Sequence, residues 1–443
     1  MAKPIKIKKG LNIPLAGPAV GNPQPDKLTD RFAITPDDFP GYTWKVVVKA
    51  GDKVKAGEPL LSAKEAMELS LVSPVTGTVE EINRGERRKI MFVSVKKEGS
   101  DEQVKFTLGA DRESRIETLK KSGLYACMRQ RPFDIVPIND NPRDIFVTAF
   151  DTAPLAPELL TADVKKHLEA GLKVLASLTD GKVYLSVPAG SGVTSQAAEV
   201  VEFEGPHPAG NVGTQIAAIK PVNKGETVWT LDAVTAARIG RLAEEGVADM
   251  STTVALTGPD IKEPHFVQTL IGASLETLLK GQLKEKSETL RVISGNVLTG
   301  EHVQPATGWL RFPYRQITVI DEGDHADEFM GWASMNPNKY SVKKTFPAFL
   351  RGLSKPFNFD ARIKGGHRAM IMSGEYDKVF PFDIYPEFLI KAIMANDIEK
   401  MEQLGIYEVA PEDFALPEFV DTSKIELQKI VRDGLDYLRK ETL

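Results

Sequence analysis

The sequence predicts a multidomain protein of mixed α/β and α+β class, and three observations indicate this. The chain has 443 residues, which at about 150 residues per domain suggests roughly three domains rather than one hydrophobic core. Short β-rich runs between glycine turns come first, and strands that alternate with helices follow them. The last part of the chain contains helical patterns that are bounded by capping residues.

Composition and charge exclude several classes of protein. Hydrophobic residues make up 42% and charged residues 26% of the chain, as in ordinary folded proteins. A net charge of −5 argues against nucleic-acid binding over the whole surface. The single cysteine, Cys127, excludes internal disulfides and any iron–sulfur or zinc site held by several thiolates of this chain. No run of about 18 apolar residues is present to span a membrane, and the basic start MAKPIKIKKG lacks the apolar region of a signal peptide.

Residues 1–40 and 41–109 form the first two predicted segments. Repeated prolines and glycines in residues 1–40 predict an extended segment rather than regular structure. Residues 41–109 contain GDKVKAGEPLL, then KEAMEL, then SPVTGTV, the order of turns and hairpin found in biotin- and lipoyl-carrier modules. In a carrier the modified lysine would follow Ala66 and Met67, but Glu68 stands there. Because a carboxylate cannot form the amide that tethers the cofactor, we expect a reused barrel-sandwich scaffold without a swinging arm.

Residues 110–258 are predicted to form an α/β domain with a parallel or mixed sheet. The predicted strands are DIFVTAF, KVYLSV, VVEFEG, TVWTL and STTVALTG, and the predicted helices are RESRIETLKKSG, residues 156–178 and DAVTAARIGRLAEEG. Residues 259–345 are predicted as a shorter α+β unit, in which FVQTLIGASLETLLKG has a helical pattern.

Residues 346–443 are predicted to be a helical region. Pro386 opens one helix, Asp397 caps the next, and Gly405 ends it. A capping box of Ser423 and Glu426 is predicted to start the last helix. Its apolar stripe is formed by Leu427, Val431, Leu435 and Leu438.

Two glycine-rich segments are candidates for anion binding. Gly190 and Gly192 follow a predicted strand, but Ser195 replaces the third glycine of the dinucleotide-binding fingerprint, which favours a surface turn over a phosphate cradle. GPHPAGNVGTQI, residues 205–216, has two interpretations: its backbone amides can bind an anion, or its prolines make it a rigid turn. His207 within it has no partner at ligand spacing, so we predict no metal site.

A basic segment, residues 340–368, is the strongest local departure from the acidic composition. Its cations are interleaved with phenylalanines, a pattern that fits single-stranded nucleic acid, an acidic protein surface, anionic lipid headgroups, or simply a solvated loop over an apolar anchor. Since the chain is acidic elsewhere, we favour docking to a partner. The docking residues predicted are Arg351, Lys355, Arg362, Lys364 and Arg368.

Several blocks taken together resemble the A subunit of the Na+-translocating NADH:quinone reductase (the NQR complex), and the resemblance covers essentially the whole chain. They are KIKKGLNIPLAG, SPVTGTVEEINRGERR, LKKSGLYACMRQRPFDIVP, IFVTAFDTAPLAPE, GPHPAGNVGTQI, VISGNVLTG and YDKVFPFDIYP. The family is similar to the C subunit of Rnf complexes and, more distantly, to the NADH- and flavin-binding subunit of respiratory complex I. The resemblance implies a barrel-sandwich module, a Rossmann-like domain, a β-grasp domain of the soluble-ligand-binding type and C-terminal helices.

The same resemblance implies a function. It indicates a peripheral subunit on the cytoplasmic face of the bacterial inner membrane, in a complex that oxidises NADH, reduces ubiquinone and exports Na+. The redox relatives bind iron–sulfur clusters through several cysteines near the C-terminus, whereas residues 416–424 here contain none. We therefore expect no cofactor, no metal and no catalytic residue on this chain, with flavins and iron centres on partner subunits.

The expected partners are the other subunits, above all the membrane-embedded B subunit, with membrane contact only through them and no nucleic acid. Quinone contact is associated with the family but is assigned to no residue. The alternative that the residues leave open is an independent soluble nucleotide-dependent oxidoreductase, and a third is a nucleic-acid adaptor that uses the basic segment.

Overall fold

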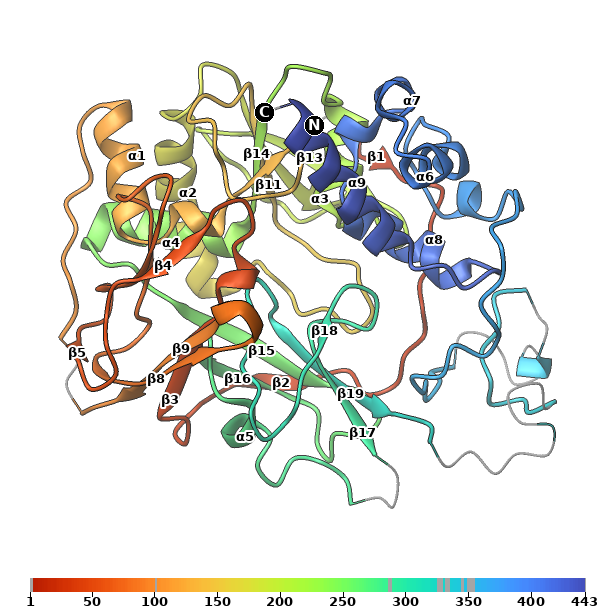
Figure 1. Ribbon diagram of the computed structural model, residues 1–443, viewed down its shortest axis with the longest axis horizontal. Coiled ribbons are helices and arrows are strands. Elements are labelled where there is room, and N and C mark those ends of the chain that lie inside the picture. The colour runs from red at the N-terminus through yellow and green to blue at the C-terminus, as the bar shows by residue number, and fades with distance from the viewer. Residues whose placement is uncertain are drawn as a thin grey trace.

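The computed structural model describes residues 3–99, 102–285, 289–324, 330, 335–343, 346–348 and 355–442. Figure 1 shows the β module at the left, the α/β domain and the C-terminal helices above, and a second sheet below. The predicted fold class is confirmed: a barrel-sandwich module, an α/β domain, a third β-rich domain and C-terminal helices follow one another along the chain. Within these ranges, no helix is both long and apolar enough to cross a bilayer.

The barrel-sandwich module consists of two small antiparallel sheets. β6 buries Leu61 and Ala63, and the same core holds Leu69, Val93 and Val95. One sheet has the order β3-β9-β8-β5 and the other β4-β6-β7. The strands are β3 (Arg31–Ile34), β4 (Trp44–Val46), β5 (Lys53–Val54), β6 (Pro59–Ala63), β7 (Ser70–Val72), β8 (Gly77–Arg84) and β9 (Ile90–Lys97).

The N-terminal segment is not free of regular structure, contrary to the expectation for residues 1–40. β1 (Ile5–Lys6) pairs in parallel with β13 of the α/β domain, and β2 (Val20–Pro25) pairs in parallel with β16 of the third domain. β3 belongs to the barrel. Because its backbone groups find partners in three different sheets, this segment ties three domains together.

The α/β domain has a six-stranded sheet of order β1-β13-β12-β11-β14-β10, with only β10 antiparallel to its neighbour. All five predicted strands are present, the last of them, β15, in the next domain. The strands are β10 (Arg129–Arg131), β11 (Ile145–Thr148), β12 (Val183–Pro188), β13 (Glu199–Glu204) and β14 (Val228–Asp232). The helices are α1 (Arg112–Lys121), α2 (Ala162–Ala176), α3 (Val212–Ile219) and α4 (Ala233–Glu245).

Two helices of this domain differ from the prediction. α2 begins later than residue 156, because Thr161 acts as its N-cap and accepts a hydrogen bond from the backbone N–H of Val164. α3 is absent from the predicted helices, since the prolines and glycines of residues 205–216 indicate a loop. The prolines in fact end before the helix, which starts at Val212.

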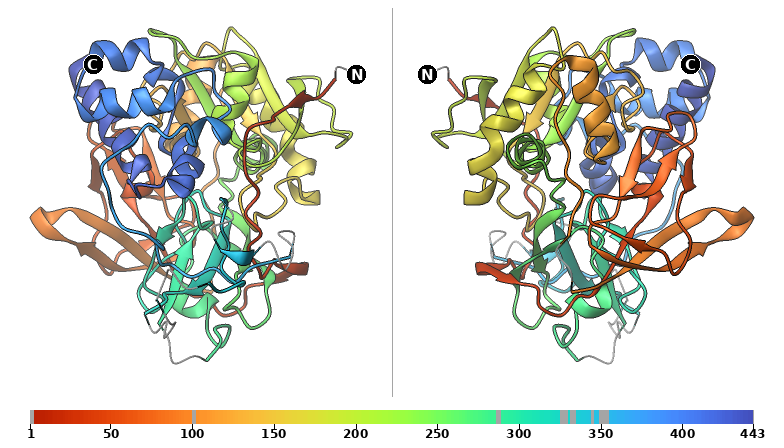
Figure 2. Two further views of the ribbon diagram at one scale, coloured as in Figure 1. Left: turned by 90° about the vertical axis from the view of Figure 1, so that its right-hand side faces the viewer. Right: turned by 90° about the vertical axis from the view of Figure 1, so that its left-hand side faces the viewer.

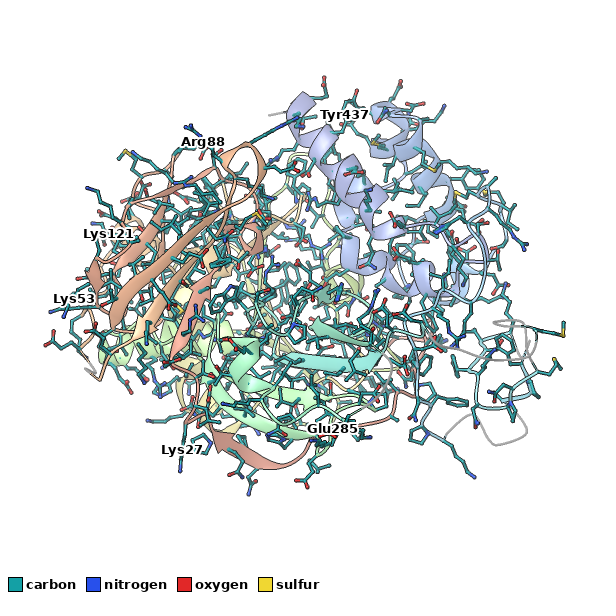
Figure 3. All side chains as sticks on the ribbon, turned by 60° about the horizontal axis from the view of Figure 1, so that its bottom comes forward. Lys27, Lys53, Arg88, Lys121, Glu285 and Tyr437 are labelled. Carbon is teal, nitrogen blue, oxygen red and sulfur yellow. The ribbon has the colours of Figure 1, made fainter. Side chains whose placement is uncertain are left out.

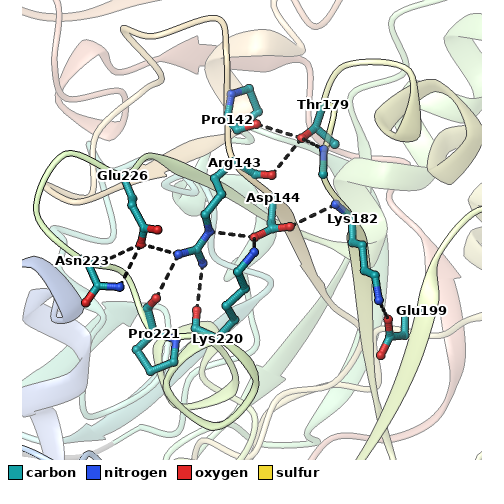
Figure 4. A network of polar contacts seen from close by, with 11 residues as sticks. Pro142, Arg143, Asp144, Thr179, Lys182, Glu199, Lys220, Pro221, Asn223 and Glu226 are labelled. Carbon is teal, nitrogen blue, oxygen red and sulfur yellow. Dashed lines mark hydrogen bonds and ion pairs between the residues drawn. The ribbon is translucent and has the colours of Figure 1, made fainter.

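A polar network holds the amino ends of β11, β12 and β14 (Figure 4). Asp144 is 1% exposed, and its Oδ2 accepts hydrogen bonds from Arg143 Nε at 2.7 Å and Lys220 Nζ at 2.8 Å. Its Oδ1 accepts from the backbone N–H of Lys182. Burial alone would raise the pKa of Asp144, but these donors, Lys220 foremost, hold it below its usual value.

The third domain has a sheet of order β18-β17-β19-β15-β16-β2. The helix expected over FVQTLIGASLETLLKG is wrong: the segment forms β16, a turn at Gly272 with φ 75°, and a helix of four residues, α5. Gly272 is required there because a Cβ would lie 2.0 Å from the carbonyl oxygen of Ala33. The elements are β15 (Ser251–Thr257), β16 (His265–Leu270), α5 (Leu275–Leu278), β17 (Leu290–Ser294), β18 (Glu301–His302) and β19 (Gln316–Asp321).

The C-terminal region contains α6 (Pro386–Met394), α7 (Ile398–Gln403), α8 (Ala415–Val420) and α9 (Leu427–Thr442). Pro386 opens α6, and the Asp397 side chain caps α7, as predicted. The predicted stripe of α9 is fully buried. Its predicted capping box is wrong, because Ser423 Oγ donates to the carbonyl of Ala369 and the helix begins only at Leu427.

The domains share a continuous interior. One hydrophobic cluster includes Leu60 of the barrel, Val147 and Leu175 of the α/β domain, and Val254 of the third domain. Figure 2 shows the C-terminal helices packed beside the α/β domain, and Figure 3 shows charged side chains such as Lys27, Lys53 and Lys121 directed outwards. Short 3-10 helices lie at Pro36–Asp38, Glu86–Arg88, Tyr125–Cys127, Tyr376–Lys378, Ile406–Glu408 and Pro411–Phe414.

Candidate functional site

The hairpin that would carry a cofactor lies against the α/β domain. Glu68 is in the turn between β6 and β7, and Met67 beside it is 78% exposed. Glu68 Oε1 lies 3.5 Å from Lys120 Nζ of α1, and Lys120 Nζ is also 2.9 Å from Asp140 Oδ2. The hairpin, α1 and the loop at Asp140 border a polar cleft of about 610 Å³. Glu68, at the position where the sequence analysis expects a carrier lysine, thus forms an ion pair between two domains.

The loop with the partial glycine fingerprint leads into a strand. Gly190 and Gly192 have φ of 75° and 68° and lie exposed between β12 and β13. Ser195 Oγ donates a hydrogen bond to Glu169 Oε2 of α2 at 2.8 Å, which holds the loop on that helix. A phosphate cradle of the dinucleotide-binding type requires the loop to open a helix, and this loop opens none. The geometry is that of a surface turn.

A different crevice occupies the place where doubly wound sheets bind ligands. From β11 the chain adds β12 and then β13 on one side, and it returns through α3 to place β14 on the other side. The order of strands thus reverses between β11 and β14, and open α/β sheets bind ligands outside the carboxyl ends of the strands at such a switch point. Thr148 ends β11, Asp232 ends β14, and both line a cavity of about 190 Å³.

The walls of this switch-point cavity come from three domains. Asp232 caps α4 by accepting from the backbone N–H of Thr235, and it forms an ion pair with Arg315 of the third domain. His207 Nδ1 lies 3.1 Å from Thr152 Oγ1, and burial lowers the pKa of His207 to about 4, so its ring is neutral at physiological pH. Glu412 enters from the C-terminal region.

An ion cluster around the buried Arg131 borders the cavity. Arg131, at the end of β10, is 1% exposed and donates from Nη1 to Asp413 Oδ2 and from Nη2 to Glu412 Oε1, both at 2.9 Å. Burial raises the pKa of Asp413, and the charge of Arg131 opposes that rise, whereas the side chain of Glu412 is 40% exposed. Sequence analysis missed this cluster, since Arg131 and Asp413 are 282 positions apart. The only signal was the anion-binding interpretation of residues 205–216, whose helix α3 borders the same place.

Comparison with protein families identifies matches along most of the chain. Three family models match: the NqrA N-terminal barrel-sandwich hybrid domain at residues 5–98, the NqrA second alpha/beta domain at 110–248 and the NQRA C-terminal domain at 253–304. The A subunit of the Na+-translocating NADH-quinone reductase of Serratia proteamaculans is 38% identical, and the match covers 99% of this chain and 100% of that one. The chain belongs to the NqrA family, the A subunits of Na+-translocating NADH-quinone reductases.

Other members of the NqrA family are similar over the same length. The A subunits of Saccharophagus degradans and Pasteurella multocida are 37% and 36% identical, again over 99% of this chain and the whole of theirs. A chain of a NAD+-reducing [NiFe]-hydrogenase has a TM-score of 0.33 at 14% identity over 68% of this chain, a likeness too low to support any argument. The resemblance on which the sequence analysis relied is thereby confirmed.

In this NqrA-family chain, only some of the cations of the basic segment are exposed without an ion-pair partner in the part that the structure describes. Arg362 and Lys364 both pair with Asp360, at 2.7 and 3.0 Å, whereas Lys355 and Arg368 are exposed. Arg351 lies outside the described residues. The rings of Phe357 and Tyr340 contact one another and Phe357 is buried, so these aromatics anchor the segment rather than form a platform for bases.

Cys127 is buried inside the molecule. It lies in the shared hydrophobic cluster, and burial raises the pKa of its thiol, which disfavours the reactive thiolate. In the part of the chain that the structure describes, no cluster of three or more histidine, cysteine, aspartate or glutamate side chains is arranged to hold a metal ion.

Proposed function

We propose that this chain is a peripheral subunit, without a redox cofactor of its own, that assembles with the other subunits of a Na+-translocating NADH-quinone reductase. The observation that carries the proposal is full-length similarity to NqrA-family proteins from several bacteria. In this proposal it lies at the cytoplasmic face of the inner membrane, next to the membrane-embedded B subunit. The flavins, the iron centres and the ion path belong to the partner subunits, and the complex reduces ubiquinone.

Two positions that hold cofactors in other proteins support the cofactor-free part of the proposal. Glu68 stands where a carrier lysine would be and is paired with Lys120. The loop at Gly190 opens no helix. A fold that once served electron transfer would then supply shape and contact surfaces to the complex.

The test is reconstitution of the complex with and without this chain. We expect the full-length chain to be purified without flavin absorbance, to copurify with the B subunit, and to restore NADH-driven ubiquinone reduction and Na+ uptake to a complex that lacks it. A stoichiometric flavin in the isolated chain would contradict the proposal. Tight NADH binding by the isolated chain, lost on Gly190→Val, would indicate a nucleotide-dependent oxidoreductase instead.

Quinone contact is a separate part of the proposal and rests on the family alone. A photoreactive ubiquinone analogue, applied to the intact complex, should label peptides of this chain. Labelling confined to other subunits, under conditions in which the analogue supports turnover, would remove quinone contact from its role.

A further inference from the structure

The N-terminus of α3 has the properties of an anion-binding site. α3 has eight residues and begins at the switch point between β11 and β14. The side chain of Asn211, at the N-cap position, makes no capping hydrogen bond. Among the hydrogen bonds of the described residues, none uses the backbone N–H groups of Val212, Gly213 or Thr214. Free amides and the positive end of the helix dipole together attract a negative group.

The negative group next to the first turn of α3 is the carboxyl group of Asp413, from the C-terminal region of the same chain. A Cβ on Gly213 would lie 2.3 Å from Asp413 Oδ1 and 2.6 Å from Oδ2, so the carboxyl group packs against the helix at Gly213, although no hydrogen bond joins it to the first-turn amides among the described residues. Gly213 does not have positive φ, so what the position requires is space. A glycine in the first turn lets the carboxyl group approach as closely as a ligand would.

On the side away from Gly213, the carboxyl group of Asp413 accepts hydrogen bonds from a guanidinium group and a backbone amide, which are donors that also bind anions. Oδ2 accepts from Arg131 Nη1 at 2.9 Å and from the backbone N–H of Ala410 at 2.8 Å. Oδ1 and Arg131 Nε are both buried without a hydrogen-bond partner in the structure. The side chain of Asp413 is 0% exposed and that of Arg131 is 1% exposed. Arg131, Gly213 and the N-terminus of α3 thus lie around one carboxyl group, next to the switch-point cavity.

We propose that Asp413 is an internal ligand of Arg131, and that it keeps a phosphate group away from the adjacent N-terminus of α3, where nucleotide-binding sheets hold such a group. The site is therefore latent in this chain, and its ligand class is a small oxyanion such as phosphate. Through its pair with Arg131, Asp413 also attaches the C-terminal region to the α/β domain. The inference does not depend on assembly with other subunits.

The experiment removes the internal ligand and offers inorganic phosphate. The full-length chain, Asp413→Ala and the double variant Glu412→Gln/Asp413→Ala are compared by thermal unfolding in phosphate and in chloride of equal ionic strength. We expect near-saturating phosphate to raise the Tm of the variants by about 3 °C more than that of the parent. Glu399→Ala, which removes an exposed charge on α7, controls for net charge and for general stabilisation by phosphate. Adding Arg131→Ala should abolish the gain.

Two results would overturn the proposal. One is a folded double variant that gains nothing from phosphate, and the other is a parent chain that binds phosphate as well as the variants do. If removal of Asp413 prevents folding, Gly213→Ala decides the question. Alanine in the first turn of a helix is normally better than glycine, so only a carboxyl group in contact with position 213 makes it worse. We expect its Tm to fall by several degrees, and an unchanged or raised Tm would refute the internal ligand.

Discussion

A single buried charge, that of Asp144, connects the amino ends of the central strands of the α/β sheet. It accepts hydrogen bonds from Arg143 and Lys182, at the amino ends of β11 and β12, and from Lys220, at the end of α3. We expect Asp144→Asn to lower the free energy of unfolding by about 2 kcal/mol, because it removes a buried acceptor and turns an amide donor toward the groups that donate to it. Urea unfolding at neutral pH measures this. Glu199→Gln, which breaks the exposed pair with Lys182, should cost about 0.5 kcal/mol or less.

Because the pKa of Asp144 is lowered in the folded chain, its contribution to the free energy of unfolding depends on pH. Its pKa is lower in the folded chain than in the unfolded chain, where an aspartate has a pKa of about 3.9. The stability it contributes is therefore complete above that value and is lost as pH falls through the folded pKa. The parent should lose stability more steeply below about pH 4 than Asp144→Asn does. Parallel curves for the two proteins would show that Asp144 is not the group responsible.

At the residue scale, a local sequence motif predicts which residue type is expected at a position, but it does not predict the contacts of the residue that stands there. Glu68 is identified from its neighbours along the chain, because carrier motifs fix the position of the lysine. Its ion pair with Lys120 depends on how two domains pack, and no local pattern encodes that. The contact of Asp413 with Gly213 joins segments that are distant in sequence, so the glycine alone gives no indication of its neighbour.

At the element scale, α2 and α4 cross more closely than ordinary helices because each has a glycine at the contact. A Cβ on Gly171 would lie 1.8 Å from the carbonyl oxygen of Ala236, and one on Gly240 would lie 2.0 Å from that of His167. We expect Gly171→Ala to destabilise the chain by about 2 kcal/mol, despite the better helix propensity of alanine, because the helices must move apart. Denaturant unfolding tests it, with the exposed Lys173→Ala on the same helix as control. A stabilised Gly171→Ala variant would mean that the helices are not in backbone contact.

Elements with a period and a cap are predictable from the sequence, and elements set by their neighbours are not. The stripe of α9 and the cap of α7 are local signals, and both are present in the structure. β16 has the pattern of a helix because its apolar residues continue into α5, while the turn at Gly272 is set by contact with the backbone of Ala33. α3 escapes prediction because the rigid segment before it contains two prolines. For β16 and α5, tertiary contact overrides local propensity. For α3, a helix of eight residues is too short to show a clear apolar period in the sequence.

At the scale of the whole molecule, the domains form one body whose interior is shared, so function is expected at its surfaces. The N-terminal segment supplies strands to three sheets, and one hydrophobic cluster crosses three domains. The chain length and the local patterns predict the order of the domains, but they do not predict the shared strands and the shared hydrophobic cluster that join them. A chain built in this way is suited to hold partner subunits in fixed relative positions, which is the role proposed for it.

The basic segment offers a direct test of that role. Asp360 pairs with both Arg362 and Lys364 and balances one of their two charges, so among the described docking residues Lys355 and Arg368 are the exposed ones. Neither has an ion-pair partner among the residues that the structure describes. We expect Lys355→Glu/Arg368→Glu to weaken copurification with the B subunit about tenfold in low salt, whereas Arg362→Glu should also disturb the local fold by repelling Asp360.

The matched control reverses two exposed lysines far from this segment. Lys27 and Lys45 carry the same charge and are exposed, and Figure 3 shows Lys27 on the opposite side of the molecule from the C-terminal helices. Lys27→Glu/Lys45→Glu should assemble like the parent, because the attraction is local and is screened beyond about 10 Å at about 0.1 M salt. If both double variants lose assembly equally, net charge rather than a docking surface is responsible. If neither does, the basic segment is not where the partner binds.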